Sequence, residues 1–252
     1  DALYILGDLF EYWAGDDDLD DPFNAEICAG LRILSKSGVP LFFFFFYRDF
    51  LAGDGFASKA GLTLLPDPVL VEIAGASVLL MHGDTLCTDD EAYQNFRVEV
   101  RSPEWRQSFL ALPLDQRKAK IEALRQESEA QKRAKPIELM DVNPIAVVQV
   151  LTFHRCTRLI HGHTHRPALH RLEVAGEACE RWVLPDWYES GGYLACDASG
   201  CRLLESPPAA VSLAKTRPRR APSRPARPPP TPARRPIEAG SRGCLKQHAP
   251  LR

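Results

Sequence analysis

The sequence predicts an α/β fold that carries a helical insertion, and three observations support this prediction. Apolar runs with the length of buried strands alternate with helical stretches over residues 2–81. Several of these runs are followed at once by a side chain that can bind metal, at the edge where open α/β sheets place their ligands. Residues 89–141 then show a charged, helical pattern without any strand pattern, which is typical of an insertion.

The first predicted strand covers residues 2–6 and is followed by Gly7 and Asp8. A continuous apolar run of this kind is typical of a parallel strand that is covered on both faces. Asp8 is therefore a candidate metal ligand by its position alone. The alternative is an acidic residue that caps a helix or closes a turn.

A helix is predicted over residues 22–37, because its apolar side chains recur at spacings of three and four and Gly38 follows. The next apolar run, from Val39, includes five consecutive phenylalanines at residues 42–46. A buried strand accounts for part of this run. Aromatic side chains pointing to both faces along its whole length would overfill a packed layer.

Residues 52–65 predict a short helix and a turn, and two strands are predicted at residues 69–73 and 77–81 around Gly75. The second of these strands ends at His82. A side chain that can bind a metal thus follows an apolar strand here as well.

Three prolines divide the predicted insertion into separate helices: Pro103, Pro113 and Pro136. In its last helix Ser128, Lys132 and Lys135 are spaced at four and three, which places them on one helix face. The alternative to a binding role for this face is an ordinary solvated, charged surface.

The segment that starts at Asn143 predicts a further helix, in which we expect Ile145, Val148 and Leu151 to face the core. A short strand follows and ends in the sequence HGHTHRP, residues 161–167. Later strands are predicted at residues 168–174, 181–184 and 192–195.

Three histidines lie within five residues of this motif, and in an extended segment His161, His163 and His165 would point to the same side. Neutral imidazole suits Mn, Fe, Zn or Ni, so the cluster alone does not identify the metal. The alternative is a surface loop that is rich in histidine.

The net charge of −2 conceals two different parts of the chain. Residues 207–252 hold eleven Lys and Arg against one acidic residue, whereas residues 1–206 hold 20 basic and 32 acidic residues, a balance of −12. The basic part also contains eleven of the 21 prolines and cannot bury enough apolar surface to fold. We therefore expect a folded domain at 1–206 and a disordered tail at 207–252, with no nucleic-acid partner.

The seven cysteines are scattered and form no C-x-x-C pair, which predicts reduced thiols in a cytoplasm. No apolar run reaches the roughly 18 residues of a membrane-spanning helix. No signal peptide precedes the first strand, so we expect any contact with a membrane to be peripheral.

Asp8, His82, His163 and His165 all follow apolar strands, and they combine one carboxylate with three imidazoles. Such a set suits two divalent metals about 3.5–4 Å apart that are bridged by the carboxylate and by a hydroxide nucleophile. A phosphate ester or anhydride gains most from this clamp, because both its attacked and its leaving oxygens are stabilised by cations. No nucleophile elbow, Walker loop or dinucleotide fingerprint competes for the chemistry.

These motifs resemble the ordered blocks of the calcineurin-like metallophosphoesterases: Gly7-Asp8, Tyr47-Arg48-Asp49, His82-Gly83-Asp84 and Gly162-His163-Thr164-His165. The segments 7–13 (GDLFEYW), 82–90 (HGDTLCTDD), 140–144 (MDVNP) and 161–167 resemble more specifically the UDP-2,3-diacylglucosamine hydrolase family of lipid A biosynthesis. The resemblance extends from residue 1 to about residue 205. It implies a sandwich of two mixed β-sheets flanked by helices, with the helical insertion at about 89–141 forming a lid.

The resemblance also implies a reaction and its setting. A two-manganese site would hydrolyse the pyrophosphate of UDP-2,3-diacylglucosamine to UMP and 2,3-diacylglucosamine 1-phosphate. The enzyme would act as a peripheral protein at the cytoplasmic face of the bacterial inner membrane. Asp8 would bridge the metals, and His82, His163 and His165 would complete their coordination.

Carried over in the same way, substrate contacts are implied for Arg48, Asp90, Ser128, Lys132, Lys135 and His163. Lys132 stands where similar proteins often have Asn. Four apolar side chains of the insertion would cradle acyl chains, rest on the bilayer or pack onto the core: Phe109, Leu110, Leu112 and Leu114.

Two departures from the family pattern concern the metal site. The family begins with a strand that ends in Asp-x-His, and no residue precedes Asp1 here. Tyr47 replaces the Asn that ligates the second metal in the family, and a neutral phenol is a poor substitute for an amide oxygen. We therefore expect one metal site to be incomplete, and two alternatives stay open: a metallophosphoesterase of other specificity, or a catalytically impaired, lipid-binding protein.

Overall fold

The structure is a computed structural model that describes residues 1–44, 49–134, 137–187 and 191–205, without the side chains of residues 129–138. Its strands are β1 (Leu3–Ile5), β2 (Leu41–Phe44), β3 (Thr63–Leu65), β4 (Val69–Ile73), β5 (Ala76–Met81), β6 (Arg158–His161), β7 (Ala168–Val174), β8 (Glu177–Val183), β9 (Gly192–Asp197) and β10 (Gly200–Glu205). Its α-helices are α1 (Pro22–Lys36), α2 (Asp54–Ala60), α3 (Glu91–Val100), α4 (Pro103–Leu110), α5 (Leu114–Ala134) and α6 (Pro144–His154).

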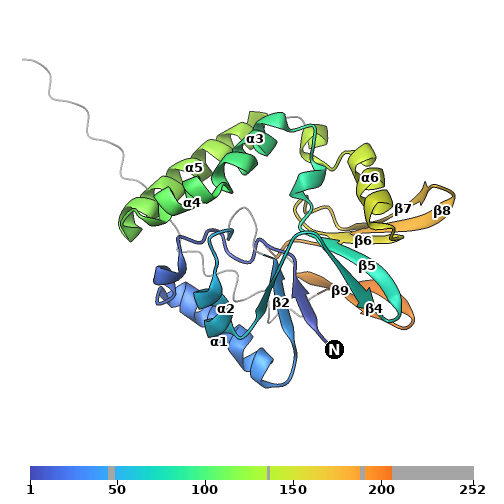
Figure 1. Ribbon diagram of the computed structural model, residues 1–252, viewed down its shortest axis with the longest axis horizontal. Coiled ribbons are helices and arrows are strands. Elements are labelled where there is room, and N and C mark those ends of the chain that lie inside the picture. The colour runs from blue at the N-terminus through green and yellow to red at the C-terminus, as the bar shows by residue number, and fades with distance from the viewer. Residues whose placement is uncertain (45–48, 135–136, 188–190, 206–252) are drawn as a thin grey trace, which may run out of the picture. The chain divides into compact units, whose positions relative to one another are not determined.

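The strands form two principal sheets (Figure 1). The first sheet is parallel and has the order β1-β2-β3. The second has the order β4-β5-β6-β8-β7 and is mixed, because β5, β6 and β8 are parallel while β4 and β7 are antiparallel edge strands. An antiparallel pair of β9 and β10 accompanies them.

Side chains that alternate along the strands build three apolar layers. One layer lies between the two sheets: Leu6, Phe44, Val78, Leu80 and Ile160. On the outer face of the first sheet Phe43 packs with α1 and α2, and on the outer face of the second sheet Leu79 and Leu159 pack with α6. The arrangement is helix, sheet, sheet, helix, which confirms the predicted sandwich.

The phenylalanine run is explained in part by this alternation. Phe43 and Phe44 are both fully buried, on opposite faces of β2, and the ring of Phe42 stacks on Tyr4 at 4.8 Å between ring centroids. Two-sided burial therefore accommodates the residues of the run that belong to the strand. The remaining phenylalanines of the run lie outside the described residues.

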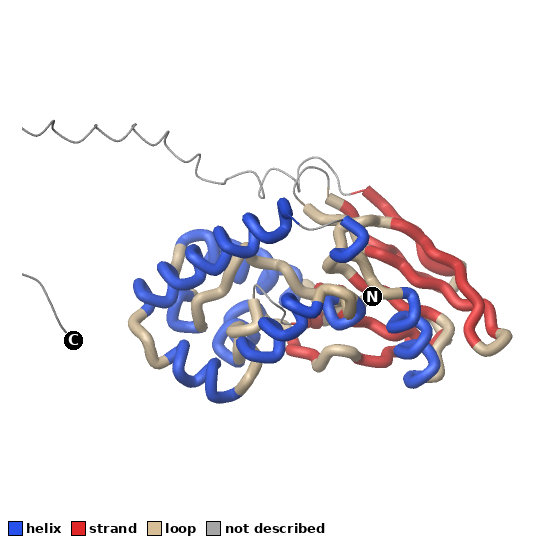
Figure 2. Tube along the Cα trace, turned by 90° about the horizontal axis from the view of Figure 1, so that it is seen from above, coloured by secondary structure: helices blue, strands red, loops and turns tan. Residues whose placement is uncertain are grey.

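The insertion is helical, as predicted, and contains α3, α4 and α5. Figure 1 shows these helices together, and Figure 2 shows most of the helical chain gathered on one side of the strands. Arg117 anchors α5 to the core. Its guanidinium is buried, donates to the Leu112 carbonyl oxygen at 3.0 Å and to Ala14, and forms an ion pair with Asp17.

One expectation for α6 is wrong. Leu151 is buried as predicted, but the side chains of Ile145 and Val148 are 67% and 38% exposed, and Val147 is buried instead. The helix is apolar around much of its circumference, so the spacing of its apolar residues does not identify the inner face. β3 and β10 were also not anticipated: β3 has only three residues, and β10 is as long as its partner β9 and was missed.

The expectation that all thiols are reduced is wrong for one pair. Cys196 and Cys201 are opposite each other across β9 and β10 and form a disulfide, whereas Cys28, Cys87, Cys156 and Cys179 are free and buried. Within the described part of the chain, no helix is both long enough and apolar enough to span a membrane. The prediction of a disordered tail at 207–252 falls outside the described residues.

Candidate metal centre

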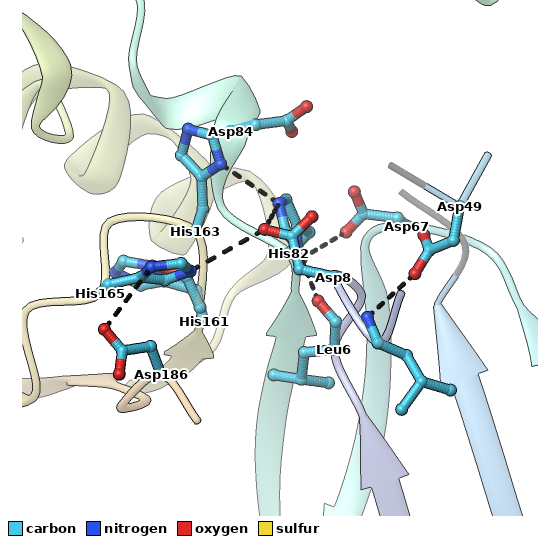
Figure 3. Close-up of polar contacts among 12 residues, drawn as sticks. Leu6, Asp8, Asp49, Asp67, His82, Asp84, His161, His163, His165 and Asp186 are labelled. Carbon is cyan, nitrogen blue, oxygen red and sulfur yellow. Dashed lines mark hydrogen bonds and ion pairs between the residues drawn. The ribbon is translucent and has the colours of Figure 1, made fainter. Parts of the chain in front are cut away.

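The ends of three strands bring Asp8, His82 and His163 together (Figure 3). Asp8 follows β1 of the first sheet, His82 directly follows β5, and His163 follows β6. β5 and β6 are parallel, with Met81 opposite His161, so their carboxyl ends meet at the same edge of the second sheet. The predicted convergence of strand ends is therefore present in the folded chain.

The ligand atoms of these three residues all lie within 4.8 Å of one another. His82 Nε2 is 3.9 Å from Asp8 Oδ2 and 3.2 Å from His163 Nδ1. His165 adds an imidazole on the other side of the carboxylate, with Nε2 at 3.8 Å from Asp8 Oδ2. One carboxylate thus faces three imidazoles, which is the set of residues predicted from the sequence.

The backbone at this centre is unusual. Asp8, His163 and His165 have φ values of 54°, 64° and 54°, in the left-handed region that residues with a Cβ rarely adopt. Such conformations cost about 1–3 kcal/mol each and are concentrated at functional sites. Three of the four candidate ligands therefore hold their side chains in place against local backbone preference.

The imidazole of His82 has a fixed orientation. The ring is 1% exposed, and Nδ1 lies 2.7 Å from the carbonyl oxygen of Leu6, which can only accept a hydrogen bond. Nδ1 is therefore the protonated nitrogen of the neutral ring, and the lone pair of Nε2 points to Asp8 and His163. Because Leu6 directly follows β1 of the first sheet and His82 directly follows β5 of the second, this bond also connects the two sheets at the site.

His161 does not join this cluster. β6 ends at this residue, and the positive φ values of His163 and His165 turn the following segment, so the expectation of three histidines on one extended face is wrong. The His161 ring is fully buried, donates from Nδ1 to the Gly162 oxygen at 2.9 Å and accepts at Nε2 from Arg181 at 3.1 Å. Burial, together with the Arg181 charge, lowers the pKa of His161 to about 3, so the ring is neutral.

Gly83 is needed for the close packing around His161. The glycine has a φ of 112°, and a Cβ built there would lie 2.6 Å from His161 Nδ1. The backbone at residue 83 can therefore pass directly over the buried imidazole of His161 only because this residue has no side chain.

The predicted substrate residues are only partly described. Asp90 is buried and caps α3 by accepting from the Tyr93 backbone N–H at 3.1 Å, and Ser128 lies half-buried on α5. Arg48 and Lys135, with Tyr47, lie outside the described residues, as does the side chain of Lys132. Their roles, and that of Ser128, stay predictions.

Three acidic residues around the centre were not anticipated. Asp186 Oδ2 lies 3.8 Å from His165 Nδ1, Asp67 accepts from the His82 backbone N–H at 3.1 Å, and Asp84 is fully buried in an ion pair with Arg97 at 2.8 Å. Asp186 had a usable signal, because it follows a predicted strand just as Asp8 does. Burial raises the pKa of Asp67.

The donor chemistry of the cluster fits a divalent transition metal. Carboxylate oxygen and imidazole nitrogen are ligands shared by Mn, Fe, Co, Ni and Zn sites. The hydrogen bond from His82 Nδ1 to a backbone carbonyl is an arrangement that commonly orients histidine ligands in metal sites. The residues present can therefore hold such an ion.

An apolar cavity of about 60 Å³ lies between the insertion and the segments that follow β1 and β2. It is lined mainly by aromatic and aliphatic side chains, among them Trp13, Phe50, Trp105, Phe109 and Leu124. Phe109 is 5% exposed and stacks on Trp105, so the packing alternative holds for this residue, whereas Leu110 is 37% exposed. A second cavity, of about 250 Å³, lies beside β7 and β8 and is lined by several charged residues.

Comparison with known proteins gives a consistent picture, although no protein-family profile matches the sequence. A protein of Aromatoleum aromaticum named UDP-2,3-diacylglucosamine hydrolase is 53% identical over 199 residues, which cover 79% of this chain and 81% of the relative. Proteins with the same name from an Enterobacter species and from Aeromonas hydrophila are each 48% identical, over 82% and 81% of this chain and 86% and 84% of the relatives.

Proposed function

Because the chain belongs to the UDP-2,3-diacylglucosamine hydrolase family, we propose that it hydrolyses the pyrophosphate bond of UDP-2,3-diacylglucosamine in lipid A biosynthesis. The products are UMP and 2,3-diacylglucosamine 1-phosphate. The observation that carries this proposal is the convergence of Asp8, His82 and His163 from the two sheets, with their ligand atoms within 4.8 Å. Residues 1–206 form the catalytic domain in this proposal.

Asp8, His82, His163 and His165 would hold the metal, and Mn²⁺ is the ion we expect. When bound, divalent cations supply the Lewis acidity that activates water and neutralises charge on the pyrophosphate. Asp8 contributes the only carboxylate of the set and faces all three imidazoles. His82 presents an unprotonated Nε2 because its Nδ1 proton is held by Leu6.

The surroundings of the cluster keep its geometry fixed. The neutral, buried His161 fills the space behind Gly83 and brings no positive charge to a site that must attract cations. Asp186, beside His165 Nδ1, adds negative charge on the outer side of that imidazole. A carboxylate in this position increases the basicity of a histidine ligand and limits its rotation.

The apolar cavity next to the insertion supports a lipid substrate. Its aromatic lining can accommodate hydrocarbon once α4 and α5 move apart, and the exposed Leu110 adds apolar surface on α4. We propose that the insertion acts as a lid over the acyl chains, with Asp90, Ser128, Arg48, Lys132 and Lys135 contacting the polar part of the substrate. A lipid substrate also supports a peripheral position at the cytoplasmic face of the inner membrane.

The test is an assay of UMP release from UDP-2,3-diacylglucosamine with added Mn²⁺, compared with hydrolysis of an aryl phosphate. We expect release of UMP that EDTA abolishes, and a loss of at least about 100-fold in His82→Gln and His163→Gln. His154→Gln, in a histidine at the end of α6, is the matched control and should be unchanged. Preferential hydrolysis of the aryl phosphate, or UMP release that persists in both variants, would contradict the proposal.

A further inference from the structure

The larger cavity shares a wall with the candidate metal centre. Four consecutive residues alternate along this wall: His163 and His165 approach Asp8 or His82, whereas Thr164 and Arg166 line the cavity. A ligand in the cavity would therefore be separated from the metal ligands only by the thickness of this loop. The cavity has a volume of about 250 Å³, just below the roughly 300–1,000 Å³ of typical small-molecule sites.

The charged side chains that line the cavity carry more positive than negative charge, among apolar neighbours that include Pro167, Ala168 and Val183. Two guanidinium groups, of Arg166 and Arg181, face it together with the single carboxylate of Asp141. Arg166 is ion-paired with Asp141 at 2.5 Å, which holds a donor and an acceptor side by side. Arg181 uses one nitrogen to donate to His161, and its other N–H groups make no hydrogen bond to the residues that the structure describes.

Two further observations indicate a binding site rather than a packing defect. Thr164 lines the cavity, and its Oγ1 is buried and makes no hydrogen bond to another described residue, so a rotation of this side chain would offer an unsatisfied hydroxyl to a ligand. Arg181 is partly buried, and burial lowers its pKa against the opposing effect of the nearby Asp141 carboxylate. Its charge is therefore held partly out of water, and it forms no ion pair with a carboxylate of the described residues. An anionic or carbonyl-rich ligand compensates such a group.

The two cavities differ in the way that the two halves of the substrate differ. The aromatic cavity adjoins segments of the first sheet and the insertion, whereas the charged cavity adjoins β7 and β8 of the second sheet. The candidate metal ligands come from both sheets. A pyrophosphate that joins an acylated sugar to a nucleoside would thus have an apolar cavity for one half and a cavity with charged side chains for the other.

We infer that the cavity lined by Asp141, Thr164, Arg166 and Arg181 binds the uridine 5′-monophosphate half of the substrate. This inference rests on the proposed function and adds to it the site that recognises the nucleotide. The guanidinium groups donate to the uracil carbonyl oxygens and to the phosphate, and Asp141 accepts from the uracil N3–H. The acceptor beside a donor, formed by Asp141 and Arg166, matches the edge of uracil and does not match cytosine, whose N3 is an acceptor.

The test measures UMP binding to the full chain in Mn²⁺ by isothermal titration calorimetry, with inorganic phosphate as a second probe. Arg166→Gln removes one guanidinium, and Ala168→Leu fills the cavity without a change of charge. We expect both variants to bind UMP at least about tenfold more weakly, since a hydrogen bond to a charged group contributes about 1.5–3 kcal/mol. Ala168→Leu should bind inorganic phosphate as the unmodified chain does.

The control is Arg202→Gln, which removes a guanidinium from an ion pair with Asp197 away from the cavity and should not change UMP affinity. Unchanged UMP affinity in both Arg166→Gln and Ala168→Leu would overturn the inference, as would an equal loss of UMP and phosphate binding in Ala168→Leu. If both cavity variants keep their UMP affinity and the unmodified chain hydrolyses the lipid substrate, this inference is wrong and the proposed function stands. If the cavity variants weaken UMP binding but the unmodified chain does not hydrolyse the lipid substrate, the proposed function is wrong and this inference stands.

Discussion

At the scale of single residues, the candidate ligands depend on neighbours that fix their rings and their backbone. Asp8, His163 and His165 adopt positive φ values, and His82 is oriented by the carbonyl of Leu6. The positive φ values cost stability, whereas the buried hydrogen bond from His82 to Leu6 contributes to it. They are consistent with a chain in which local strain is retained because it positions side chains for a cation.

Asp186 offers a direct test of such positioning. Its carboxylate lies 3.8 Å from His165 Nδ1, so Asp186→Asn removes a negative charge beside an imidazole while keeping the shape of the side chain. We expect the affinity for Mn²⁺ to fall by about 10–100-fold, the usual effect of losing a residue that supports a metal ligand. Calorimetric titration of Mn²⁺ measures this change. Asp197→Asn, at an exposed carboxylate paired with Arg202, is the control, and equal Mn²⁺ affinity in both variants would show that Asp186 has no such role.

Cys87 gives a prediction for alkaline pH. Burial, together with the nearby Asp84 carboxylate, raises the pKa of its thiol from 9.0 to about 12. Between these values the unfolded thiol has lost its proton and the folded one has not, so the folded state binds more protons and stability falls as pH rises. The contribution is fully present below pH 9 and is lost by about pH 12.

Urea unfolding of the unmodified chain and of Cys87→Ala at several pH values measures this effect. The unmodified chain should lose stability more steeply above pH 9, so that the difference in free energy between the two proteins narrows toward pH 12. If the difference in the free energy of unfolding between the two proteins stays constant from pH 8 to pH 12, the thiol does not have a raised pKa in the folded state. That result would contradict the burial of the thiol.

At the scale of secondary-structure elements, the position of the site follows from strand pairing. The parallel register of β5 and β6 places His82 beside the segment that leads to His163, and the Gly162 N–H donates to the His82 carbonyl oxygen at 2.8 Å. β1 brings Asp8 from the other sheet. The insertion is tied to the core by the buried Arg117 and by an ion pair of Arg125 with Glu11 at 2.8 Å.

The inner face of α6 can be tested with two substitutions on the same helix. Leu151 is 1% exposed in the core between α6 and the second sheet, so Leu151→Ala should destabilise the fold by about 2–5 kcal/mol. Ile145 is 67% exposed, and Ile145→Ala should change stability by less than about 0.5 kcal/mol. Urea unfolding compares the two. A cost for Ile145→Ala that equals that of Leu151→Ala would mean that α6 packs through a different face.

The sequence predicted most elements and missed those whose signal depends on tertiary contacts. The strand at β7 and the hairpin of β4 and β5 were predicted because alternation and turn residues are local signals. β3 is three residues long and is recognised as a strand only by its pairing with β2. The inner face of α6 could not be predicted, because apolar residues occupy most of its surface.

The part of the site that was predicted consists of side chains that directly follow apolar strands. The convergence of Asp8, His82, His163 and His165 was predicted in this way, and their role as ligands stays a prediction. The exclusion of His161 depends on a turn that the spacing of three histidines does not reveal. The disulfide between Cys196 and Cys201 was missed because the pairing of β9 with β10, rather than a cysteine motif, places the two thiols opposite each other.

At the scale of the whole folded unit, the candidate centre exists only where the two sheets meet. Asp8 comes from the first sheet and the imidazoles from the second, and the layer of Leu6, Phe44 and Leu80 between the sheets sets the separation of the two groups. The charged cavity is lined by Thr164 and Arg166 of the loop that carries His163 and His165, and the apolar cavity lies between the insertion and the segments that follow β1 and β2. In our proposal the apolar cavity receives the lipid half of the substrate and the charged cavity receives the nucleotide half.

The most direct measurement of the central claim is anomalous diffraction at the manganese absorption edge, on crystals of the chain grown with Mn²⁺. We predict an anomalous peak bounded by Asp8, His82 and His163, with His165 on the far side of the carboxylate, and no such peak in crystals of Asp8→Asn. Absence of a peak among these residues, or a peak that survives Asp8→Asn undiminished, would contradict the assignment of this cluster as the metal centre.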